Sequence, residues 1–430
     1  MTDQAGSVEP PEPVARALAE ALATERLGIV ASLIRTTGDW DLAEDAVADA
    51  AERALRRWPI DGVPDNPAAW LTTTARRRAI DLIRRAATER AKLTEIALTD
   101  ELRDNSPADA NMTFSNDDRL RLIFTCAHPA LAMEARVALT LKVVAGLSTE
   151  AIASAFLTTE ATMGQRLLRA KRKIAHAGIP YQVPPADALP ERLDGVLATV
   201  YLIFTSGYAR SAGDLAEEAI RLGRLLVRLL PYSDESRALL ALMLLQHARR
   251  DARTVHGELV TLEEQDRSRW DRAMIDEALA LLAWSAGNRG PYRLQAELAA
   301  VHATAQDAAA TDWTRIVRLY EELLELAPSP VVALNRAIAV GMADGPLTGL
   351  AALDELGDEP RLAGYHLLPA ARADLLARAG QQPDAIRVLE QAIALAPTEP
   401  ERRQLTRRRD ELLRQTPADP TVDTRDRPVR

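Results

Sequence analysis

The stretch that decides the fold is residues 148–173, STEAIASAFLTTEATMGQRLLRAKRK, which predict two short helices joined by a tight turn. Ser148 and Thr159 stand where these helices would begin, and each hydroxyl can accept a hydrogen bond from a backbone N–H of the first turn. The second helix carries an apolar stripe at spacings i, i+4, i+7 and i+11, formed by Met163, Leu167, Ala170 and Ile174. These residues predict a helix-turn-helix.

The other faces of the second helix are polar and basic. An apolar back with a donor-rich front fits the DNA major groove, where Arg and Gln read base edges and further cations meet phosphates. The alternative is an amphipathic helix with a solvated basic face. The candidate DNA-binding residues are Thr159, Thr162, Gln165, Arg166, Arg169, Lys171, Arg172 and Lys173.

This stretch resembles the last helix-turn-helix of bacterial sigma factors, above all that of the extracytoplasmic-function group. The matching positions are Ile152-Ala153, Phe156, Thr159, Thr162-Met163 and Arg166-Leu167-x-Arg169-Ala170-Lys171. The resemblance implies that this helix contacts the promoter −35 element. One position differs, because Leu157 stands in the turn where the family usually has Gly, the residue that adopts positive φ freely.

Another helical module precedes the helix-turn-helix, at residues 14–93. Its helix over residues 41–55 has a small apolar stripe of Ala43, Ala46, Val47, Ala50 and Ala54. Opposite lies an acidic face of Asp41, Asp45, Asp49 and Glu52. Like charges four residues apart destabilise a helix slightly, so the face suggests a basic partner, although a plain solvated face is the alternative.

After a polar loop at Ile60–Pro67, a further helix begins at Asn66-Pro67, with Pro in its first turn. Trp70, Ala79, Leu82 and Ile83 are predicted to face inward and leave the arginines outside. Trp70 could also be a base-stacking platform, but a core position is the favoured interpretation.

The first module resembles the sigma domain that binds core polymerase and reads the −10 element. The resemblance lies in the acidic helix and in the pattern that follows it, Pro67-x-x-Trp70-Leu71 and Ala75-Arg76-x-x-x-Ile80-Asp81-x-x-Arg84-Arg85. Docking on the polymerase, at its β′ subunit, is what the resemblance implies for Asp41, Glu44, Asp45, Asp49 and Glu52. Ala48 replaces a usual Gln there. Contact with −10 DNA, or support of that site, is implied for Asn66, Trp70, Arg76, Arg77, Asp81, Arg84 and Arg85. For Ile60–Asp65 the resemblance implies the wall of a pocket that receives a base flipped from the non-template strand.

The overall composition of the chain limits the classes of function that it can have. The chain has 430 residues, a net charge of −9, 47% hydrophobic residues and a mean hydropathy of −0.14. Basic residues gather in two islands, at residues 75–92 and 159–178, so aimed contacts are expected and a generally basic nucleic-acid coat is excluded. A single cysteine excludes an internal disulfide, and no membrane-length apolar run or signal pattern appears. We therefore expect a cytoplasmic protein without membrane contact.

The predicted order of domains follows from these patterns. Residues 14–93 form the first module, which resembles sigma region 2, and residues 117–179 form the second module, which resembles sigma region 4. The predicted linkers are residues 94–116 and 180–190, and the predicted disordered tails are residues 1–13 and 416–430. Residues 191–415 are predicted to form a helical extension, so the fold class is all-α.

The extension contains a similar sequence motif three times, at residues 224–231, 322–328 and 391–397. The intervals are close to three and two repeats of ~34 residues, the period of tetratricopeptide helical hairpins. Tyr365–Pro397 matches the repeat best and Asp312–Ala343 less well; an irregular helical domain with chance periodicity is the alternative. Stacked hairpins bind proteins or ligands rather than perform chemistry. A subgroup of these sigma factors carries such an extension, which implies regulation of sigma activity through a regulatory protein or ligand.

Common catalytic motifs are absent from the sequence, so an enzyme is not expected, nor is a cofactor or a metal. Cys126 and His128 could be half of a metal site, but no second pair of ligands appears, and a structural role is favoured. Two functions stay open: a sigma factor that joins core RNA polymerase at promoter DNA, or a helix-turn-helix regulator fused to a repeat scaffold that does not join polymerase. The first module favours the sigma factor, because a plain regulator needs only one DNA-reading unit.

Overall fold

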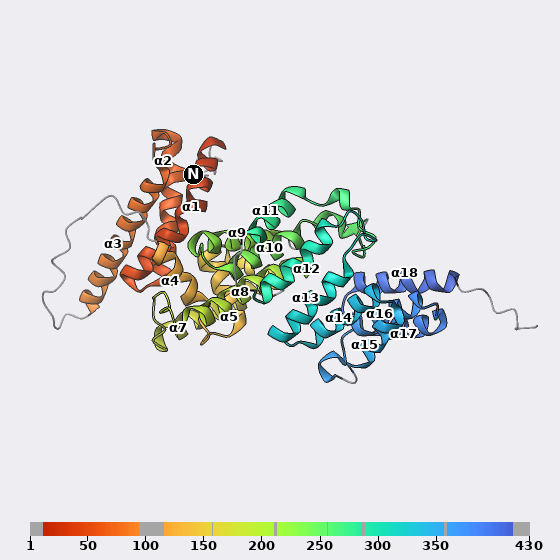
Figure 1. Ribbon diagram of the computed structural model, residues 1–430. Helices are drawn as coiled ribbons and strands as arrows, with labels where there is room; N and C mark the ends of the chain where they lie inside the picture. The colour runs from red at the N-terminus through yellow and green to blue at the C-terminus, as the bar shows by residue number, and fades with distance from the viewer. Residues whose placement is uncertain are drawn as a thin grey trace, which may run out of the picture. The chain divides into compact units, whose positions relative to one another are not determined.

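The computed structural model describes residues 12–93, 116–156, 158–209, 213–255, 257–284, 289–356 and 359–415. Within these ranges the chain is almost entirely helical, as predicted, and the strands are two-residue β1 (Thr254–Val255) and β2 (Glu258–Leu259), paired antiparallel (Figure 1). The chain divides into two compact units, Met1–Leu222 and Gly223–Arg430. Most of the predicted tails (residues 1–11 and 416–430), residues 94–115 of the predicted linker, and Leu157 lie outside the described residues. Glu12, Pro13 and Asn116, which were predicted to lie in a tail or in the linker, are helical instead.

The first module is a bundle of three mutually packed helices: α1 (Glu12–Thr37), α2 (Trp40–Asp61) and α3 (Pro67–Leu93). The Asp39 carboxylate begins α2 by accepting from the backbone N–H groups of Asp41 and Leu42. The predicted stripe of α2 is confirmed, because all five of its apolar residues are buried. Four of them are alanines, whose small side chains let neighbouring backbones approach closely.

The second module consists of α4 (Asn116–Cys126), α5 (Met133–Leu139), the π-helical turn η1 (Thr140–Ala145), α6 (Thr149–Ala155) and α7 (Glu160–His176). Gly146 ends η1 in the left-handed region at φ 84°. Both predicted caps are confirmed: Ser148 Oγ accepts from the N–H of Ala151, and Thr159 Oγ1 accepts from the N–H of Thr162. The predicted stripe of α7 is buried, so the periodicity of the sequence located this helix.

Helix α8 (Leu189–Ala209) belongs to the same compact unit, although the sequence placed residues 191–222 in the extension. It packs on α4 and α5 and buries Leu197, Ile203 and Phe204 completely. Arg192 donates to the carbonyl oxygen of Phe124 at 2.8 Å. The second module therefore shares its core with α8.

The second unit is a run of helices in which each packs on the next. It contains the end of α9 (Gly213–Leu229), then α10 (Asp234–His247), α11 (Arg272–Ala283), α12 (Pro291–Thr304), α13 (Trp313–Leu326), α14 (Pro330–Ala343), α15 (Pro346–Asp354), α16 (Leu367–Arg378), α17 (Gln382–Leu395) and α18 (Glu399–Gln415), with 3-10 turns η2 (Arg250–Ala252), η3 (Arg267–Arg269) and η4 (Pro360–Leu362). The segments 312–343 and 365–397 each hold one helical hairpin, as the repeat pattern predicted.

Close backbone contact holds one pair of these helices together. A Cβ at Gly349 of α15 would lie 2.5 Å from the Cα of Gly341 in α14. Leu375 of α16 packs against both glycines. Glycine at these two positions therefore permits the approach of α14 and α15.

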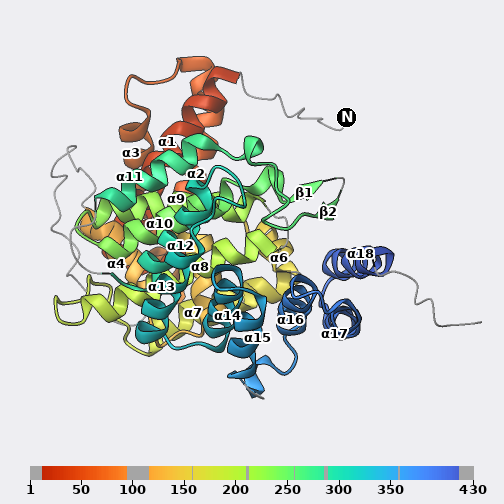
Figure 2. The same cartoon turned by 45° about the vertical axis from the view of Figure 1, so that its right-hand side comes forward.

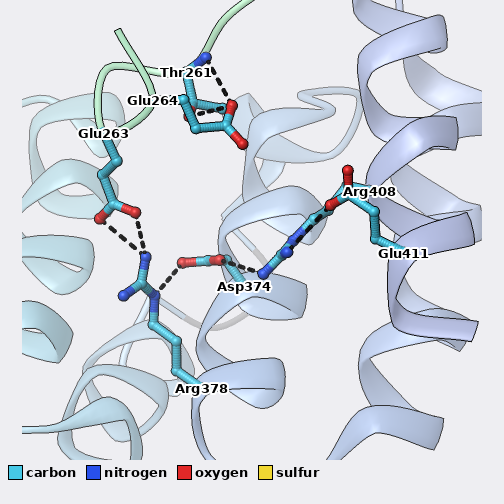
Figure 3. Close-up of polar contacts among 7 residues, drawn as sticks. All are labelled: Thr261, Glu263, Glu264, Asp374, Arg378, Arg408 and Glu411. Atoms are coloured by element: carbon cyan, nitrogen blue, oxygen red, sulfur yellow. Dashed lines mark hydrogen bonds and ion pairs between the residues drawn. The ribbon is translucent and has the colours of Figure 1, made fainter. Parts of the chain in front are cut away.

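Charged side chains tie the β hairpin to the last helices. In Figure 3, Arg378 of α16 contacts Glu263 and Asp374, and Asp374 also pairs with Arg408 of α18. Figure 2 shows β1 and β2 beside α18. Arg407 of α18 donates to the carbonyl oxygen of Leu259 in β2 at 3.1 Å.

Candidate functional site: an acidic helix face and two basic helix faces

The outward face of α7 presents the predicted DNA-binding side chains. Gln165, Arg169, Arg172 and Lys173 are exposed, and Arg166 is half-buried. Thr159 and Thr162 are exposed at the helix start and share a hydrogen bond between their hydroxyl oxygens at 2.8 Å. Because the opposite stripe is buried, α7 can offer this face only outward, as groove binding requires.

Lys171 differs from the other predicted DNA-binding residues. Its Nζ lies 2.6 Å from Asp41 Oδ1 and 2.7 Å from Glu44 Oε2, and only 12% of its side chain is exposed. Burial lowers the pKa of Lys171, but the attraction of Glu44 and hydrogen bonds to both carboxylates outweigh it and raise the pKa above its usual value. The structure thus directs Lys171 toward α2, away from the outward face where the sequence placed it.

The acidic face of α2 is present, but its carboxylates differ in their exposure to solvent. Asp41, Asp45 and Glu52 are exposed, whereas Glu44 and Asp49 are half-buried. Asp49 is paired with Arg78 of α3, and Glu52 is paired with Arg56. Burial raises the pKa of Asp45, and the like charges of Asp41 and Asp49 add to that effect. Crowded carboxylates of this kind favour the approach of a cationic surface.

Helix α3 presents the predicted −10 side chains. Asn66 Oδ1 accepts from the N–H of Ala69 at 3.0 Å and so caps the helix. Trp70 is half-buried and packs edge-to-face against Trp58, with ring centroids 5.5 Å apart, which fits the predicted core position. The exposed residues are Arg76, Arg77, Asp81, Arg84 and Arg85.

Two details of this helix and its preceding loop differ from the sequence prediction. Ile83 was predicted to face inward, but 42% of it is exposed, because the bundle contacts α3 mainly through Leu71, Ala75 and Ala79. Residues 60 and 61 belong to the last turn of α2, which continues past Pro59. Ile60 is 84% exposed there, so the candidate pocket wall is partly helical.

Arg26 is the residue that sequence analysis missed. Its guanidinium donates to the carbonyl oxygens of Val143 at 2.9 Å and Lys142 at 3.3 Å, and it lies 4.0 Å from Glu44. The two carbonyl groups that it binds are more than a hundred residues away in the chain, so no local pattern could have identified this role. Arg26 links α1 to the segment that leads into the helix-turn-helix.

Cys126 and His128 occupy structural positions. Cys126 is fully buried, and burial raises the pKa of its thiol. His128 Nδ1 accepts from the N–H of Ala130 at 3.1 Å. Among the described residues no group of three or more acidic, His or Cys side chains is placed to hold a metal, and no described helix is long and apolar enough to cross a membrane.

The second unit contains a pocket of about 560 Å³ beside α18. Four arginines and three acids line it together with Thr406: Arg402, Arg403, Arg407, Arg414, Glu258, Glu399 and Asp410. Arg403 pairs with Glu258 at 3.0 Å, and Arg402 pairs with Glu399 at 2.6 Å. The side chains that line this pocket therefore carry charges of both signs.

Comparison with known proteins agrees with this arrangement. The sigma-70 region 2 family matches residues 18–89, sigma-70 region 4 matches residues 121–174, and a family of unknown function (DUF6596) matches residues 192–286. An uncharacterised protein of Rhizobium meliloti is 44% identical over 87% of this chain and 91% of its own length. The probable extracytoplasmic-function RNA polymerase sigma factor SigI of Mycobacterium tuberculosis is 31% identical over 38% of this chain and 56% of SigI.

Among solved structures, yeast Tom70 aligns over 94% of this chain and 86% of its own, at 12% identity and a TM-score of 0.34, a similarity too low to define the fold. The classification rests on the two sigma modules, on their helices and on the sequence relatives. The chain belongs to the extracytoplasmic-function group of bacterial RNA polymerase sigma factors, in a subgroup with a C-terminal, tetratricopeptide-like helical extension.

Proposed function

We propose that this chain joins core RNA polymerase, directs it to specific promoters and helps to melt the DNA there, and that the extension regulates this activity. The observation that carries the proposal is one compact unit that holds two modules with different charged faces. One offers an acidic helix face together with an arginine-lined helix, and the other offers a basic recognition helix. A regulator that only binds DNA has no use for the first module.

The acidic face of α2 would bind the polymerase. Asp41, Asp45 and Glu52 are exposed on it, and Glu44 and Asp49 complete the set. Complementary charge steers two proteins together and sets their orientation. A basic surface of the polymerase β′ subunit, with the β subunit nearby, is therefore the proposed partner.

The two proposed DNA contacts would involve different forms of DNA, a separated strand at one element and a duplex at the other. The exposed cations of α3, with Asn66 and Trp70 near its start, would contact the −10 element and guide a separated strand, since cationic grooves and aromatic rings suit single-stranded bases. The outward face of α7 would read duplex DNA at the −35 element through Gln165, Arg166 and Arg169. Thr159, Thr162, Arg172 and Lys173 would add phosphate contacts.

The extension is proposed to bind a regulatory protein or ligand. Successive hairpins offer extended binding surfaces, and the pocket lined by Arg402, Arg403, Arg407 and Arg414 favours an acidic group.

The test uses the full chain with purified bacterial core polymerase. Gel filtration measures co-elution, and sequencing of RNA 5′ ends made on the source bacterium's genomic DNA locates the start sites. We expect a stable complex and discrete starts. The variant Asp45→Lys places a cation within the acidic face and should weaken the complex at least tenfold. Its matched control is Asp384→Lys on α17, an acid exposed to a similar degree in the extension.

The DNA contact is tested by Arg166→Ala/Arg169→Ala, with Arg387→Ala on α17 as the exposed control. Each lost base contact costs about 1–3 kcal/mol of discrimination, so starts at the wild-type sites should fall more than tenfold while the control keeps them. A chain that binds its DNA but never co-elutes with polymerase would be a regulator outside the polymerase, and the proposal would be wrong.

A further inference from the structure

The pocket beside α18 is elongated, because its lining residues run along nearly the whole helix. Glu399 of the first turn and Arg414 of the last turn both line it. A rise of about 1.5 Å per residue places these two residues about 22 Å apart along the helix axis. Glu258 of β2 contributes to the lining from outside α18, and Figure 2 shows the strand beside the helix. An extended peptide of about seven residues, at about 3.3 Å each, covers the same length.

Every acid that lines this pocket already has an arginine partner, whereas two of the lining arginines have no acid. The pairs are Glu258 with Arg403, Glu399 with Arg402 and Asp410 with Arg409. In the described part of the chain, Arg407 and Arg414 bond only to carbonyl oxygens, those of Leu259 at 3.1 Å and of Asp410 at 3.2 Å. Their guanidinium groups keep free N–H donors, which a carboxylate can accept in pairs.

The wall that faces α18 is fixed by ion pairs on the other side of the helix. Arg378 of α16 contacts Glu263, which follows β2 in the chain, at 2.8 Å (Figure 3). Asp374 of α16 pairs with both Arg378 and Arg408 of α18, at 2.7 and 3.7 Å. The segment after β2, α16 and α18 are thus joined without any contribution from the two unpaired arginines. A site that is held in place before binding costs less to order when a partner arrives.

The chemistry of the lining favours a peptide over a small molecule or DNA. Sites for small molecules are mostly apolar and enclose their ligand, but this lining consists of charged side chains and Thr406. Duplex DNA presents phosphates along its whole length and would meet the carboxylates of the same lining. An extended acidic segment can instead place its carboxylates at the unpaired arginines and its backbone along the helix, as acidic motifs do on arginine clusters.

We propose that the pocket between β2 and α18 binds an extended acidic peptide segment of a partner protein, with carboxylates at Arg407 and Arg414. This inference rests on the proposed function, because it names the chemistry of the regulatory partner that the extension binds. Two guanidinium groups seven positions apart on one helix face also give the site a minimum length. One isolated anion cannot reach both, since about 10 Å of helix separates their backbone positions.

The first experiment measures the binding of a fluorescent decaglutamate peptide to the full chain by fluorescence anisotropy at low salt. The chain carries a net charge of −9, so its overall field repels this probe and binding requires a local basic site. We expect saturable binding of decaglutamate and none of a glycine–serine peptide of the same length. Absence of decaglutamate binding would overturn the proposal.

A pair of double variants tests whether the unpaired arginines carry this binding. Arg407→Gln/Arg414→Gln should weaken decaglutamate binding at least tenfold. The control Arg361→Gln/Arg387→Gln removes the same charge from exposed positions of the second unit outside the pocket and should change the affinity less than twofold. Equal losses in the two double variants would overturn the proposal, because net charge alone would then explain the binding.

Two single variants leave the bond between Arg407 and Leu259 intact, with circular dichroism as the check on folding. Arg414→Gln, on the exposed last turn of α18, should weaken decaglutamate binding at least threefold. Asp410→Asn removes a carboxylate from the lining and should strengthen it. Opposite directions are expected, and any other pattern in folded variants would overturn the proposal.

Citrate and pyrophosphate, added as competitors, separate a peptide site from a site for small anions. Each offers several negative charges without the length of the pocket. We expect both to compete only far above the concentration of decaglutamate. If either displaced the peptide at an equal concentration, the site would bind a small anion and the peptide assignment would be wrong.

A decaglutamate peptide that carries a benzophenone group locates the site on the chain. We expect photocrosslinks on α18 and on the β hairpin, and these should persist with duplex DNA in excess. Crosslinks confined to the basic faces of α3 and α7 would overturn the proposal. Peptide binding does not require polymerase, so a chain that binds decaglutamate in this pocket but never co-elutes with polymerase would refute the proposed function and leave this site standing.

Discussion

Gly146 offers a prediction whose size follows from the structure. It lies at φ 84° where η1 ends, a left-handed conformation that costs an L-residue about 1–2 kcal/mol. An added Cβ would lie 2.9 Å from the Arg26 guanidinium, so this flexible group must move and weaken its bonds to η1. Charged hydrogen bonds contribute about 1.5–3 kcal/mol, of which water restores a part. Gly146→Ala should therefore destabilise the second module by about 2–4 kcal/mol.

The matched control is Gly164→Ala in the middle of α7. No atom lies within 4 Å of the Cβ position there, and Ala is favoured over Gly in helices by about 0.5–1 kcal/mol. Hydrogen exchange of peptides from residues 133–176, measured on the full chain, reports the local opening free energy. Opposite signs are expected for the two variants. If Gly146→Ala left protection within 1 kcal/mol of wild type, the argument from backbone conformation and from Arg26 would be refuted.

Four further predictions concern single features. Thr159→Ala removes the cap of α7 and should cost about 0.5–2 kcal/mol in the same exchange experiment, whereas Thr159→Ser should retain it. Gly349→Ala forces α15 away from the backbone of Gly341 and should lower the unfolding midpoint by the equivalent of about 1–3 kcal/mol, while Gly364→Ala, with open space around it, should not. Burial, aided by Arg249 and Arg267, lowers the pKa of His302 to about 4 from 6.5. Between pH 6.5 and 4 the unfolded chain therefore binds a proton at His302 that the folded chain does not bind. Stability thus falls as pH falls through this window, by at most about 3 kcal/mol. The variant His302→Gln should flatten this dependence of stability on pH, and a titration of His302 near 6.5 by NMR would contradict the prediction. A chain ending at 209 should keep the exchange protection of α4 and α5, and one ending at 185 should lose it, because α8 packs on both helices.

Much of the candidate site could be predicted because its signals are local. Helix caps join residues three apart, as Thr159 and Thr162 do, and the stripe of α7 repeats within four turns. The hairpins at 312–343 and 365–397 follow from the same short-range periodicity. The error at Ile83 arose because periodicity allowed an inward position there, whereas α3 buries Leu71, Ala75 and Ala79 instead.

The sequence by itself determined the helices, their caps, the acidic and basic faces and the family, because each depends on residues within a few turns of one another. Tertiary structure alone decided where those faces point. Lys171 meets Asp41 across 130 residues, Arg26 reaches Val143 across 117, and α8 joins the second module rather than the extension. Such contacts depend on how helices pack, and packing selects among many equally amphipathic partners that no local pattern distinguishes.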